Sequence, residues 1–373
     1  MKIFKILLVI ILCCCFLPCG CGKKERVIVL GVAAPFTGEL AQFGESIKNA
    51  VELALSEINQ SGGVLGYKIE YIIGDDKADP KEAVSVAQRL VTINNIIAVI
   101  GHFNSGCSIP ASEIYDANGI IQLTPASTNP RLTERGLKFV FRNLPNDNEN
   151  GRQLAEFAVN RLNAKRILII YANNAYGKGL ADIFEKRATE LGANILSKET
   201  YDPAVDVDFR PIISKWLKIE ADVICISGET PKGAIFIKQA REMGIKLPFI
   251  GGDGIDSSEL WKIAGDGADG VCVTSYFHYT DDRQEAQDFV RKYKDKYNDI
   301  PDVWAAQSYD AVYLLVEAIR NANSIDRGLV RDSLAKIKDF PGVTGRTTFD
   351  ENGDVIGKKV IIKKVEGDKF VLY

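Results

Sequence analysis

The chain has 373 residues, of which 46% are hydrophobic and 25% are charged, and its formal net charge is −3 at pH 7. This composition excludes disorder, collagen and coiled coil as descriptions of the whole chain. The length predicts two or three domains, and the mildly acidic balance gives no reason to expect nucleic-acid binding, which needs basic patches. A single long apolar run, at the N-terminus, excludes a polytopic membrane protein.

The N-terminal segment is typical of a secretion signal. Five of the eight cysteines fall within the first 21 residues, and the apolar stretch over 6–17 is too short for a transmembrane helix. The small residues that lead to Cys21 resemble a bacterial lipoprotein signal. We therefore expect removal of residues 1–20 and a lipid on Cys21, which would hold the protein at the membrane facing the periplasm or the cell exterior. Cys19 and an ordinary signal peptide are the alternatives.

The rest of the chain alternates apolar strand-like runs with amphipathic helical stretches. A strand is expected over 26–32, and apolar residues recur at helical spacing over 43–60. Asp79 and Pro80 are a typical N-cap and first helical residue, so a helix is expected to begin there. The other elements expected before Pro145 are strands over 67–73, 96–100 and 120–124 and a short helix over 108–117.

The alternation starts again after Pro145. Strand-helix alternation predicts βαβ units, parallel sheets and helices on both faces of each sheet. Two such runs imply an α/β fold with two doubly wound lobes, and we expect the chain to cross between them at 141–148, 274–279 and 349–355. The expected strands here are 166–171, 193–197, 221–227, 249–250, 347–349 and 358–365, and the helices are 179–191, 209–217, 233–243, 283–297 and 304–322.

The motifs of the chain do not favour enzyme chemistry. Gly265–Gly270 matches G-x-G-x-x-G, but it lies between a helical segment and a strand, which favours a turn over a dinucleotide site. His102 and Cys107 are near each other in sequence, whereas a nucleophilic pair requires proximity in space. Cysteines and histidines do not occur at metal-ligand spacing. We therefore expect no catalytic residue, no cofactor and no metal, and an α/β enzyme is the disfavoured alternative.

Three loops follow the carboxyl ends of expected parallel strands, where open α/β sheets bind ligands. The loops over 101–108 and 124–128 are rich in hydroxyl groups and N–H donors, which suit a carboxylate. The loop over 251–254 supplies Asp253, and Glu229 follows another strand, so these two carboxylates are suited to an ammonium group. Because helix capping explains any one of these polar residues better than ligand binding does, the prediction rests on the set.

Several motifs resemble the leucine/isoleucine/valine-binding proteins of ATP-binding-cassette (ABC) amino-acid importers. The likeness covers essentially the whole expected mature chain. It is carried by GVAAPFTG (31–38), AQFG (41–44), DD (75–76), DP (79–80), IGH (100–102), PASEIY (110–115), TPAST (124–128), LT (132–133), RG (135–136), YGKGL (176–180), YDAVY (309–313) and FDENG (349–353). The resemblance implies a type I periplasmic binding protein, in which two doubly wound, Rossmann-like lobes are joined by three crossover strands around a ligand cleft. The expected division is a signal peptide over 1–20, lobe one over 21–145 plus 278–352, and lobe two over 146–277 plus 353–373.

The resemblance also implies roles for single residues. Ser105, Ala126 and Thr128 of lobe one would receive the ligand's α-carboxylate and help to hold its amine. Tyr176 and Asp253 of lobe two would join them when the lobes close, with Asp253 opposite the ammonium group. The full set of candidate ligand-binding residues is Ser105, Ala126, Ser127, Thr128, Tyr176, Glu229, Asp253, Phe43 and Phe103.

The chain also departs from its relatives at informative positions. Glu229 falls where leucine-binding proteins carry an aromatic residue, so it is either a second ligand of the amine or the partner of a polar side chain. Phe43 and Phe103 keep part of the pocket apolar. Some relatives join two loops by a disulfide at the positions of Ala78 and Asn104, so we expect no disulfide in the body of this chain.

These observations predict a monomeric, extracytoplasmic solute-binding protein. It would capture an amino acid, branched-chain or otherwise hydrophobic, and deliver it to an ABC permease. The alternatives within the same fold are a binder of an amide, urea or an aromatic acid, and a ligand sensor that signals to a receptor.

Overall fold

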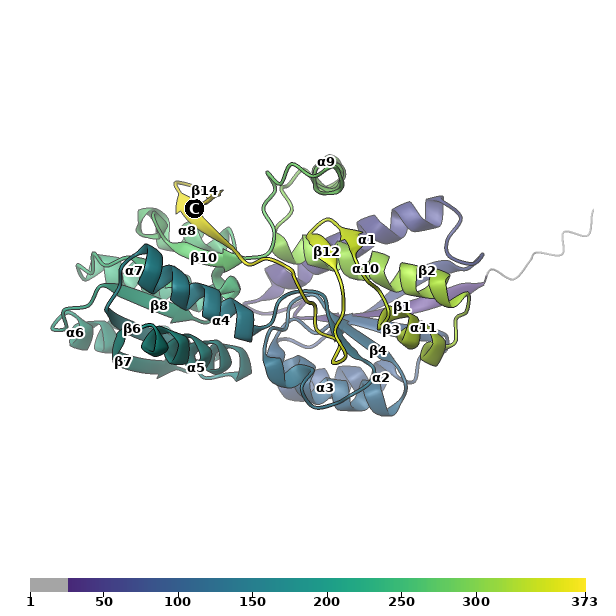
Figure 1. Cartoon of the computed structure of the whole chain (residues 1–373), viewed down its shortest axis with the longest axis horizontal. Helices are drawn as coiled ribbons and strands as arrows, with labels where there is room; N and C mark the ends of the chain where they lie inside the picture. Colours follow the sequence, from purple (N-terminus) through teal and green to yellow (C-terminus); the bar gives the residue numbers. More distant parts are fainter. Residues whose placement is uncertain (1–25) are drawn as a thin grey trace, which may run out of the picture.

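The structure, a computed structural model, describes residues 26–373, which form two α/β lobes lying side by side (Figure 1). The predicted signal over 1–20 and the predicted anchor Cys21 lie outside the described residues. Within the described part, no helix is long and apolar enough to cross a membrane. The predicted fold class, two doubly wound lobes, is confirmed by the two separate sheets of the chain.

The first lobe is built on a five-stranded sheet in the order β2-β1-β3-β4-β5, and all neighbouring strands are parallel. Every residue of its central strand β3 is buried, as expected for a parallel sheet that is covered on both faces. Its strands and helices are β1 (Val27–Ala34), α1 (Ala41–Gln60), β2 (Lys68–Asp75), α2 (Pro80–Leu90), β3 (Ile96–Gly101), α3 (Ser105–Ala117), β4 (Ile121–Thr124), a 3-10 turn (Pro130–Leu132) and β5 (Val140–Arg142).

Helices from two distant parts of the chain cover this sheet. α1 packs with α10 (Val303–Ala322) on one face, and α2 packs with α3 on the other (Figure 1). The predicted start of α2 is confirmed, because the Asp79 side chain accepts hydrogen bonds from the backbone N–H groups of Lys81 and Glu82, and Pro80 is the first helical residue. The remaining elements of this lobe are α9 (Gln284–Tyr297), α11 (Arg327–Leu334), β11 (Phe340–Gly342) and β12 (Gly345–Thr347).

The second lobe is built on a seven-stranded sheet in the order β14-β13-β10-β9-β8-β6-β7. Five of its strands are parallel, and the C-terminal hairpin β13-β14 adds antiparallel strands at one edge. Its elements are α4 (Asp147–Glu156), a π-helical turn (Phe157–Arg161), β6 (Arg166–Ala172), α5 (Ala175–Glu190), β7 (Asn194–Tyr201), α6 (Arg210–Trp216), β8 (Val223–Ser227), α7 (Lys232–Glu242), β9 (Phe249–Gly251), a 3-10 turn (Asp253–Ile255), α8 (Glu259–Ala264), a 3-10 turn (Gly265–Ala268), β10 (Cys272–Ser275), β13 (Ile361–Glu366) and β14 (Lys369–Leu372).

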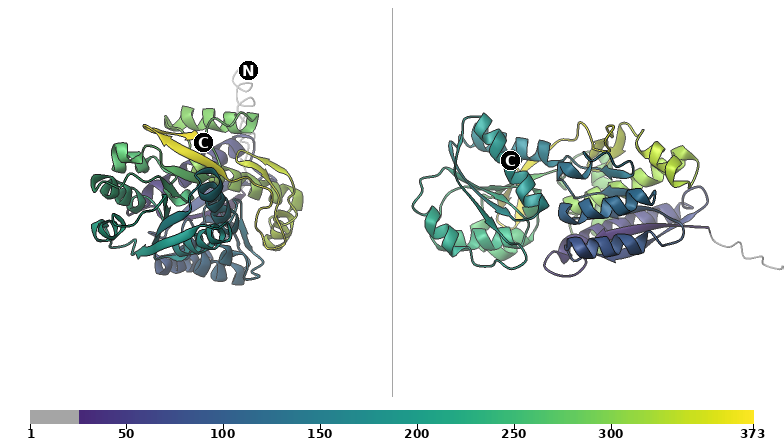
Figure 2. Two further views of the ribbon diagram at one scale, coloured as in Figure 1. Left: turned by 60° about the vertical axis from the view of Figure 1, so that its left-hand side comes forward. Right: turned by 90° about the horizontal axis from the view of Figure 1, so that it is seen from below.

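The chain passes between the lobes three times, as predicted. The view from below shows the two lobes side by side (Figure 2). The passes lead from β5 to α4, from β10 to α9, and from a hairpin closed by the Phe349–Val355 bridge to β13. The Gly265–Gly270 motif forms a 3-10 turn before β10, in agreement with its interpretation as a turn. The lobe boundaries themselves remain a prediction.

Some predicted elements differ from the observed ones. The strand expected over 347–349 lies at Gly345–Thr347, and the strand expected over 358–365 begins only at Ile361 and pairs with β14, which was not predicted. The helices α4 and α11 were also missed. Their sequences are mostly polar, and their few buried residues become evident only against the neighbouring elements.

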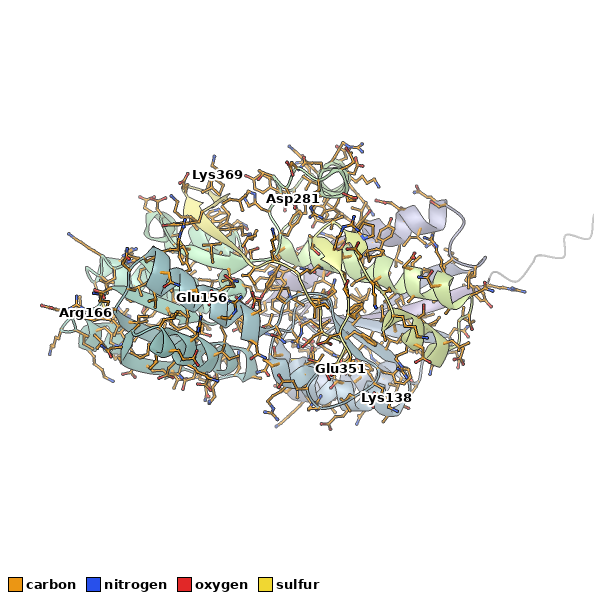
Figure 3. All side chains as sticks on the ribbon, in the orientation of Figure 1. Lys138, Glu156, Arg166, Asp281, Glu351 and Lys369 are labelled. Atoms are coloured by element: carbon orange, nitrogen blue, oxygen red, sulfur yellow. The ribbon has the colours of Figure 1, made fainter. Side chains whose placement is uncertain are left out.

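Charged side chains surround both lobes (Figure 3). Lys138 and Glu351 of the first lobe and Lys369 of the second are exposed at the periphery. Charged groups in the interior are exceptions to this arrangement. Burying a charge is unfavourable without a partner, so each such group points to a structural or binding role.

Candidate ligand-binding site

A small cavity lies between the lobes. Its walls come from the carboxyl ends of β3, β4, β6, β8 and β9 and from the start of α10, as parallel sheets favour. The lining residues are Phe103, Asn104, Ser105, Ala126 and Trp304 from the first lobe and Tyr176, Glu229, Asp253 and Gly254 from the second.

The two lobes are closed over this cavity. Asn104 of the first lobe donates a hydrogen bond of 3.2 Å from its amide to Glu229 Oε1 of the second. Asn129 donates from its amide to the carbonyl oxygen of Ala175 at 2.6 Å. Both contacts join the first lobe directly to the second, so the structure represents the closed form of the molecule.

One end of the cavity offers neutral hydrogen-bond donors. Ser105 is the first residue of α3, where free backbone N–H groups favour an anion. Its Oγ accepts from the backbone N–H of Asn129 at 3.2 Å, which leaves the hydroxyl hydrogen free to donate to a ligand. Thr128 is buried but is not part of the cavity lining; its carbonyl oxygen accepts from the backbone N–H of Asp147 at 2.8 Å, and its Oγ1 has no hydrogen-bond partner within residues 26–373.

Two predicted residues lie behind the cavity walls. The Ser127 hydroxyl donates to the carbonyl oxygen of Phe103 at 2.9 Å and contacts Ser108 Oγ at 2.6 Å, so it joins the two loops to each other. Phe43 stacks on Phe103 with 4.5 Å between ring centroids, and it supports that wall from behind. Neither side chain is part of the cavity lining.

The other end of the cavity carries the carboxylate of Asp253, which is 1% exposed. Tyr176 donates to its Oδ1 at 2.7 Å, Asn150 donates to the same oxygen at 3.0 Å, and Tyr276 donates to its Oδ2 at 3.1 Å. Burial raises the pKa of Asp253 to about 6, although these three donors oppose the shift. Asp253 is therefore held in a fixed orientation and is ready to bind a cation.

A second carboxyl group, Asp147, interacts with Asp253 but does not line the cavity. It is the first residue of α4 and fully buried, and neither of its oxygens has a hydrogen-bond partner among the described residues. Burial, followed by the negative charge of Asp253, raises its pKa well above the ordinary value, which favours its neutral, protonated form. The charge offered to a cation at this side of the cavity therefore comes from Asp253.

Glu229 forms a further acidic position in the lining and is 6% exposed. Its Oε1 accepts from the side-chain amides of Asn104 at 3.2 Å and Asn174 at 3.3 Å. Burial raises the pKa of Glu229 to about 7, so the carboxyl group changes its charge near neutral pH.

An aromatic wall faces these polar groups. Phe103 and Trp304 meet edge to face, with 5.0 Å between ring centroids, and both line the cavity. Phe43 packs against Trp304 in the same manner at 6.2 Å. The cavity thus combines an apolar wall, neutral donors at one end and carboxylates at the other.

Comparisons with known proteins agree with this geometry. The model of the family described as periplasmic binding protein matches residues 27–369. The chain belongs to the periplasmic binding protein family. A Leu/Ile/Val-binding protein homolog of Brucella abortus is 37% identical over 336 residues, which cover 89% of each chain. The leucine-, isoleucine-, valine-, threonine-, and alanine-binding protein of Pseudomonas aeruginosa is 32% identical over 328 residues, which cover 88% of this chain and 87% of that protein.

Solved structures of two binding proteins share the fold. A leucine binding protein of Thermotoga maritima superposes with a TM-score of 0.88 at 32% identity, covering 93% of this chain and 97% of that one. A branched-chain amino acid transporter substrate binding protein of Streptococcus pneumoniae, in complex with isoleucine, gives a TM-score of 0.87 at 31% identity and covers 92% and 98%. The predicted family is confirmed.

The family binds its ligands without transforming them, and the groups considered for enzyme chemistry have other roles in this periplasmic binding protein. The ring of His102 contacts Asp76 at 2.6 Å and Tyr115 at 3.1 Å in the interior. Burial raises the pKa of the Cys107 thiol well above its ordinary value, which keeps it protonated and unreactive. The cysteines of the described part, Cys107, Cys225 and Cys272, are free and buried.

Sequence reasoning placed six of its nine candidates in the cavity lining and missed several other residues. Tyr276 directly follows the carboxyl end of β10, so the signal that identified the other loops was present there as well. Asn150 and Asp147 lie in α4, which was not predicted, so no pattern pointed to them. The ligand-binding roles of the candidates remain predictions.

Proposed function

We propose that this periplasmic binding protein captures an α-amino acid between its lobes and delivers it to an ABC permease. The observation that carries the proposal is the separation of charge preferences within one small cavity. The hydroxyl of Ser105 and the free N–H groups at the start of α3, on the first lobe, suit an α-carboxylate, and the buried Asp253 of the second lobe suits an α-ammonium group. Amides and urea carry neither charged group and an aromatic acid carries only a carboxylate, so each would leave the Asp253 carboxylate unmatched.

The relatives support amino acids as the ligand class. The Brucella abortus protein is named for leucine, isoleucine and valine, the Pseudomonas aeruginosa protein is named for these three and for threonine and alanine, and the Streptococcus pneumoniae protein holds isoleucine. The aromatic wall of Phe103 and Trp304 suits the apolar part of such a side chain. Branched-chain amino acids are therefore the first candidates to test.

Binding and closure follow from the same geometry. The first lobe would receive the carboxylate in the open form, and closure would add Asp253 and Tyr176 from the second lobe. Closure also excludes water, which strengthens each charged contact. The ligand shifts the population toward the closed form by its higher affinity for that form.

Isothermal titration calorimetry with each standard amino acid tests the proposal. We expect at least one to bind with a Kd well below about 1 mM, and the same amino acid without its ammonium group to bind far more weakly. Binding weaker than millimolar for every amino acid would contradict the assignment.

We also propose that Cys21 carries a lipid that anchors the protein outside the cytoplasm. The support is the leader-like segment before it, with its apolar stretch and small residues. Membrane fractionation of cells that express Cys21→Ala should find the protein released, whereas Cys19→Ala should leave it at the membrane. Retention of the Cys21→Ala protein would refute this choice of anchor.

A further inference from the structure

Glu229 lies in the cavity but belongs to a different cluster from Asp253. Asp253 is held by Tyr176, Tyr276 and Asn150, whereas Glu229 accepts from Asn104 and Asn174. The two carboxylates share no hydrogen-bond partner in the described chain. One of them is therefore sufficient for the α-ammonium group, and the other is available to a different part of the ligand.

The surroundings of Glu229 hold an acceptor that the described residues leave unfilled. Asn104 and Asn174 both donate to Oε1, the backbone N–H of Glu229 faces its own carboxyl group, and Oε2 receives a contact of 3.4 Å from the Asn174 amide. The buried Oδ1 of Asn104 has no donor within residues 26–373, and the buried hydroxyl of Tyr201, a neighbour of Glu229, has no partner there either. Buried polar atoms without partners are unfavourable, so a ligand donor beside Asn104 Oδ1 is favoured.

The space around Glu229 extends beyond the first cavity. A second hollow between the lobes is also lined by Asn104 and Glu229, together with Lys77 and Lys232. Glu229 and Asn104 therefore border both spaces, and they share the first cavity with the aromatic rings of Phe103 and Trp304.

We infer that the ligand is an amino acid whose side chain carries a hydrogen-bond donor (a hydroxyl, amide or ammonium group), held by the Glu229 carboxylate and Asn104 Oδ1. The inference rests on the proposed function, which assigns the ligand's α-carboxylate to the surroundings of Ser105 and its α-ammonium group to Asp253. A site built to bind a donor strongly rejects the analogue that lacks it, because its buried polar groups are then left unpaired. Threonine, with a branched side chain and a hydroxyl group, fits both the aromatic wall and Glu229.

Pairs of amino acids with similar shape test the inference. Calorimetric titrations would compare threonine with valine, asparagine with leucine, and lysine with norleucine. We expect the donor-bearing member of at least one pair to bind about tenfold or more tightly, and Glu229→Met to reverse the preference in that pair. The matched control is Glu45→Gln, which alters an exposed carboxylate of α1 that lines neither hollow.

The outcomes separate this inference from the proposed function. Tighter binding of the aliphatic member in every pair by the unmodified protein would overturn the inference while leaving an amino-acid binder. Absence of binding by any α-amino acid would instead contradict the proposed function, and this inference with it. Thermal unfolding of Glu229→Met and of the shape-preserving Glu229→Gln verifies that each variant is folded, and Glu229→Gln should also weaken binding of the lysine ammonium group.

Discussion

Arg142 and Asp354 form an ion pair in the interior, with 2.8 Å between Arg142 Nε and Asp354 Oδ1, and it joins the first and third passes of the chain between the lobes. Arg142 Nη1 also donates to the carbonyl oxygens of Ser127 at 2.8 Å and Asn129 at 3.0 Å. In a trans peptide the carbonyl oxygen and the N–H point in opposite directions. The Ser127 carbonyl oxygen points toward Arg142, so the N–H of Thr128, which belongs to the same peptide group, points away from Arg142. The arginine therefore fixes the loop that we assign to the ligand carboxylate.

Replacing Arg142 by methionine should destabilise the protein strongly. The substitution leaves the Asp354 carboxylate and two loop carbonyls without their donor, and breaking a buried pair costs about 3–5 kcal/mol. Urea denaturation would measure the loss in the free energy of unfolding. Arg291→Met, which removes an exposed pair with Asp288, should cost less than about 1 kcal/mol. Equal effects of the two substitutions would contradict the structural role of Arg142.

Thr128→Val and Thr124→Val should have opposite consequences. Thr128 Oγ1 has no hydrogen-bond partner in the described chain, so its loss should leave stability unchanged and weaken the amino acid about tenfold. Thr124 Oγ1 donates to the His102 carbonyl at 2.8 Å and accepts from the Ser127 N–H at 2.9 Å. Its removal should cost about 1–3 kcal/mol of stability. Calorimetric titration and thermal unfolding of both variants check this, and unchanged affinity in Thr128→Val would refute its contact with the ligand.

Asp253→Asn should distinguish the α-ammonium group from the rest of the ligand. The substitution keeps the shape of the side chain but removes the charge, so we expect about a hundredfold loss of affinity for the amino acid, because truncating one partner of a buried charge pair is costly. The deaminated analogue of the same amino acid should lose little. Asp266→Asn, an exposed aspartate of the same lobe, is the control. Equal losses for the amino acid and its analogue would exclude an ammonium contact at Asp253.

Affinity for the amino acid should fall at acidic pH. Burial raises the pKa of Asp253 to about 6, and a proton competes with the ligand's ammonium group for the same carboxylate. The Kd should therefore increase by about tenfold for each pH unit below 6. Titrations between pH 8 and pH 4.5 measure this slope, and Asp253→Asn should remove most of it. A Kd that stays constant over this range would argue against an ionised Asp253 in the complex.

The stability of the empty protein should respond to pH in the opposite sense. The pKa of Asp253 in the closed form lies above its ordinary value, so the folded protein favours the protonated carboxyl group. The contribution of Asp253 to the free energy of unfolding is therefore present in acid and is lost as the pH rises through about 6. The melting temperature of the unliganded protein, relative to that of Asp253→Asn, should therefore be higher at pH 5 than at pH 8. A difference that does not change with pH would contradict the shifted pKa.

The parts that sequence reasoning predicted correctly are those that local patterns determine. Asp79 and Pro80 begin a helix because capping depends on neighbours in the chain. Ser105 and Asp253 reach one cavity because the ends of parallel strands meet at one edge of a sheet. β14 was missed although it pairs with the adjacent strand β13, because it is only four residues long and has a single buried residue.

The details of the site depended on packing that no local pattern records. Phe43 and Phe103 are both apolar and both near the cleft, yet only Phe103 reaches the cavity, because the two rings stack in successive layers. Ser127 and Thr128 are adjacent hydroxyl residues, yet the Ser127 hydroxyl binds the neighbouring loop, whereas Thr128 Oγ1 has no partner among the described residues. Such differences between neighbours arise from backbone direction, which is set by distant contacts such as those of Arg142.

The acidic residues that the closed lobes enclose have a consequence for the proposed transport cycle. Shutting the cleft around Asp253 and Glu229 without a ligand dehydrates carboxyl groups that are readily ionised near neutral pH. Without a ligand, the cost of dehydrating these carboxyl groups favours the open form, and the ammonium group of the amino acid offsets that cost. A permease that accepts only the closed form would then encounter almost only ligand-bound molecules, so little ATP would be hydrolysed without transport.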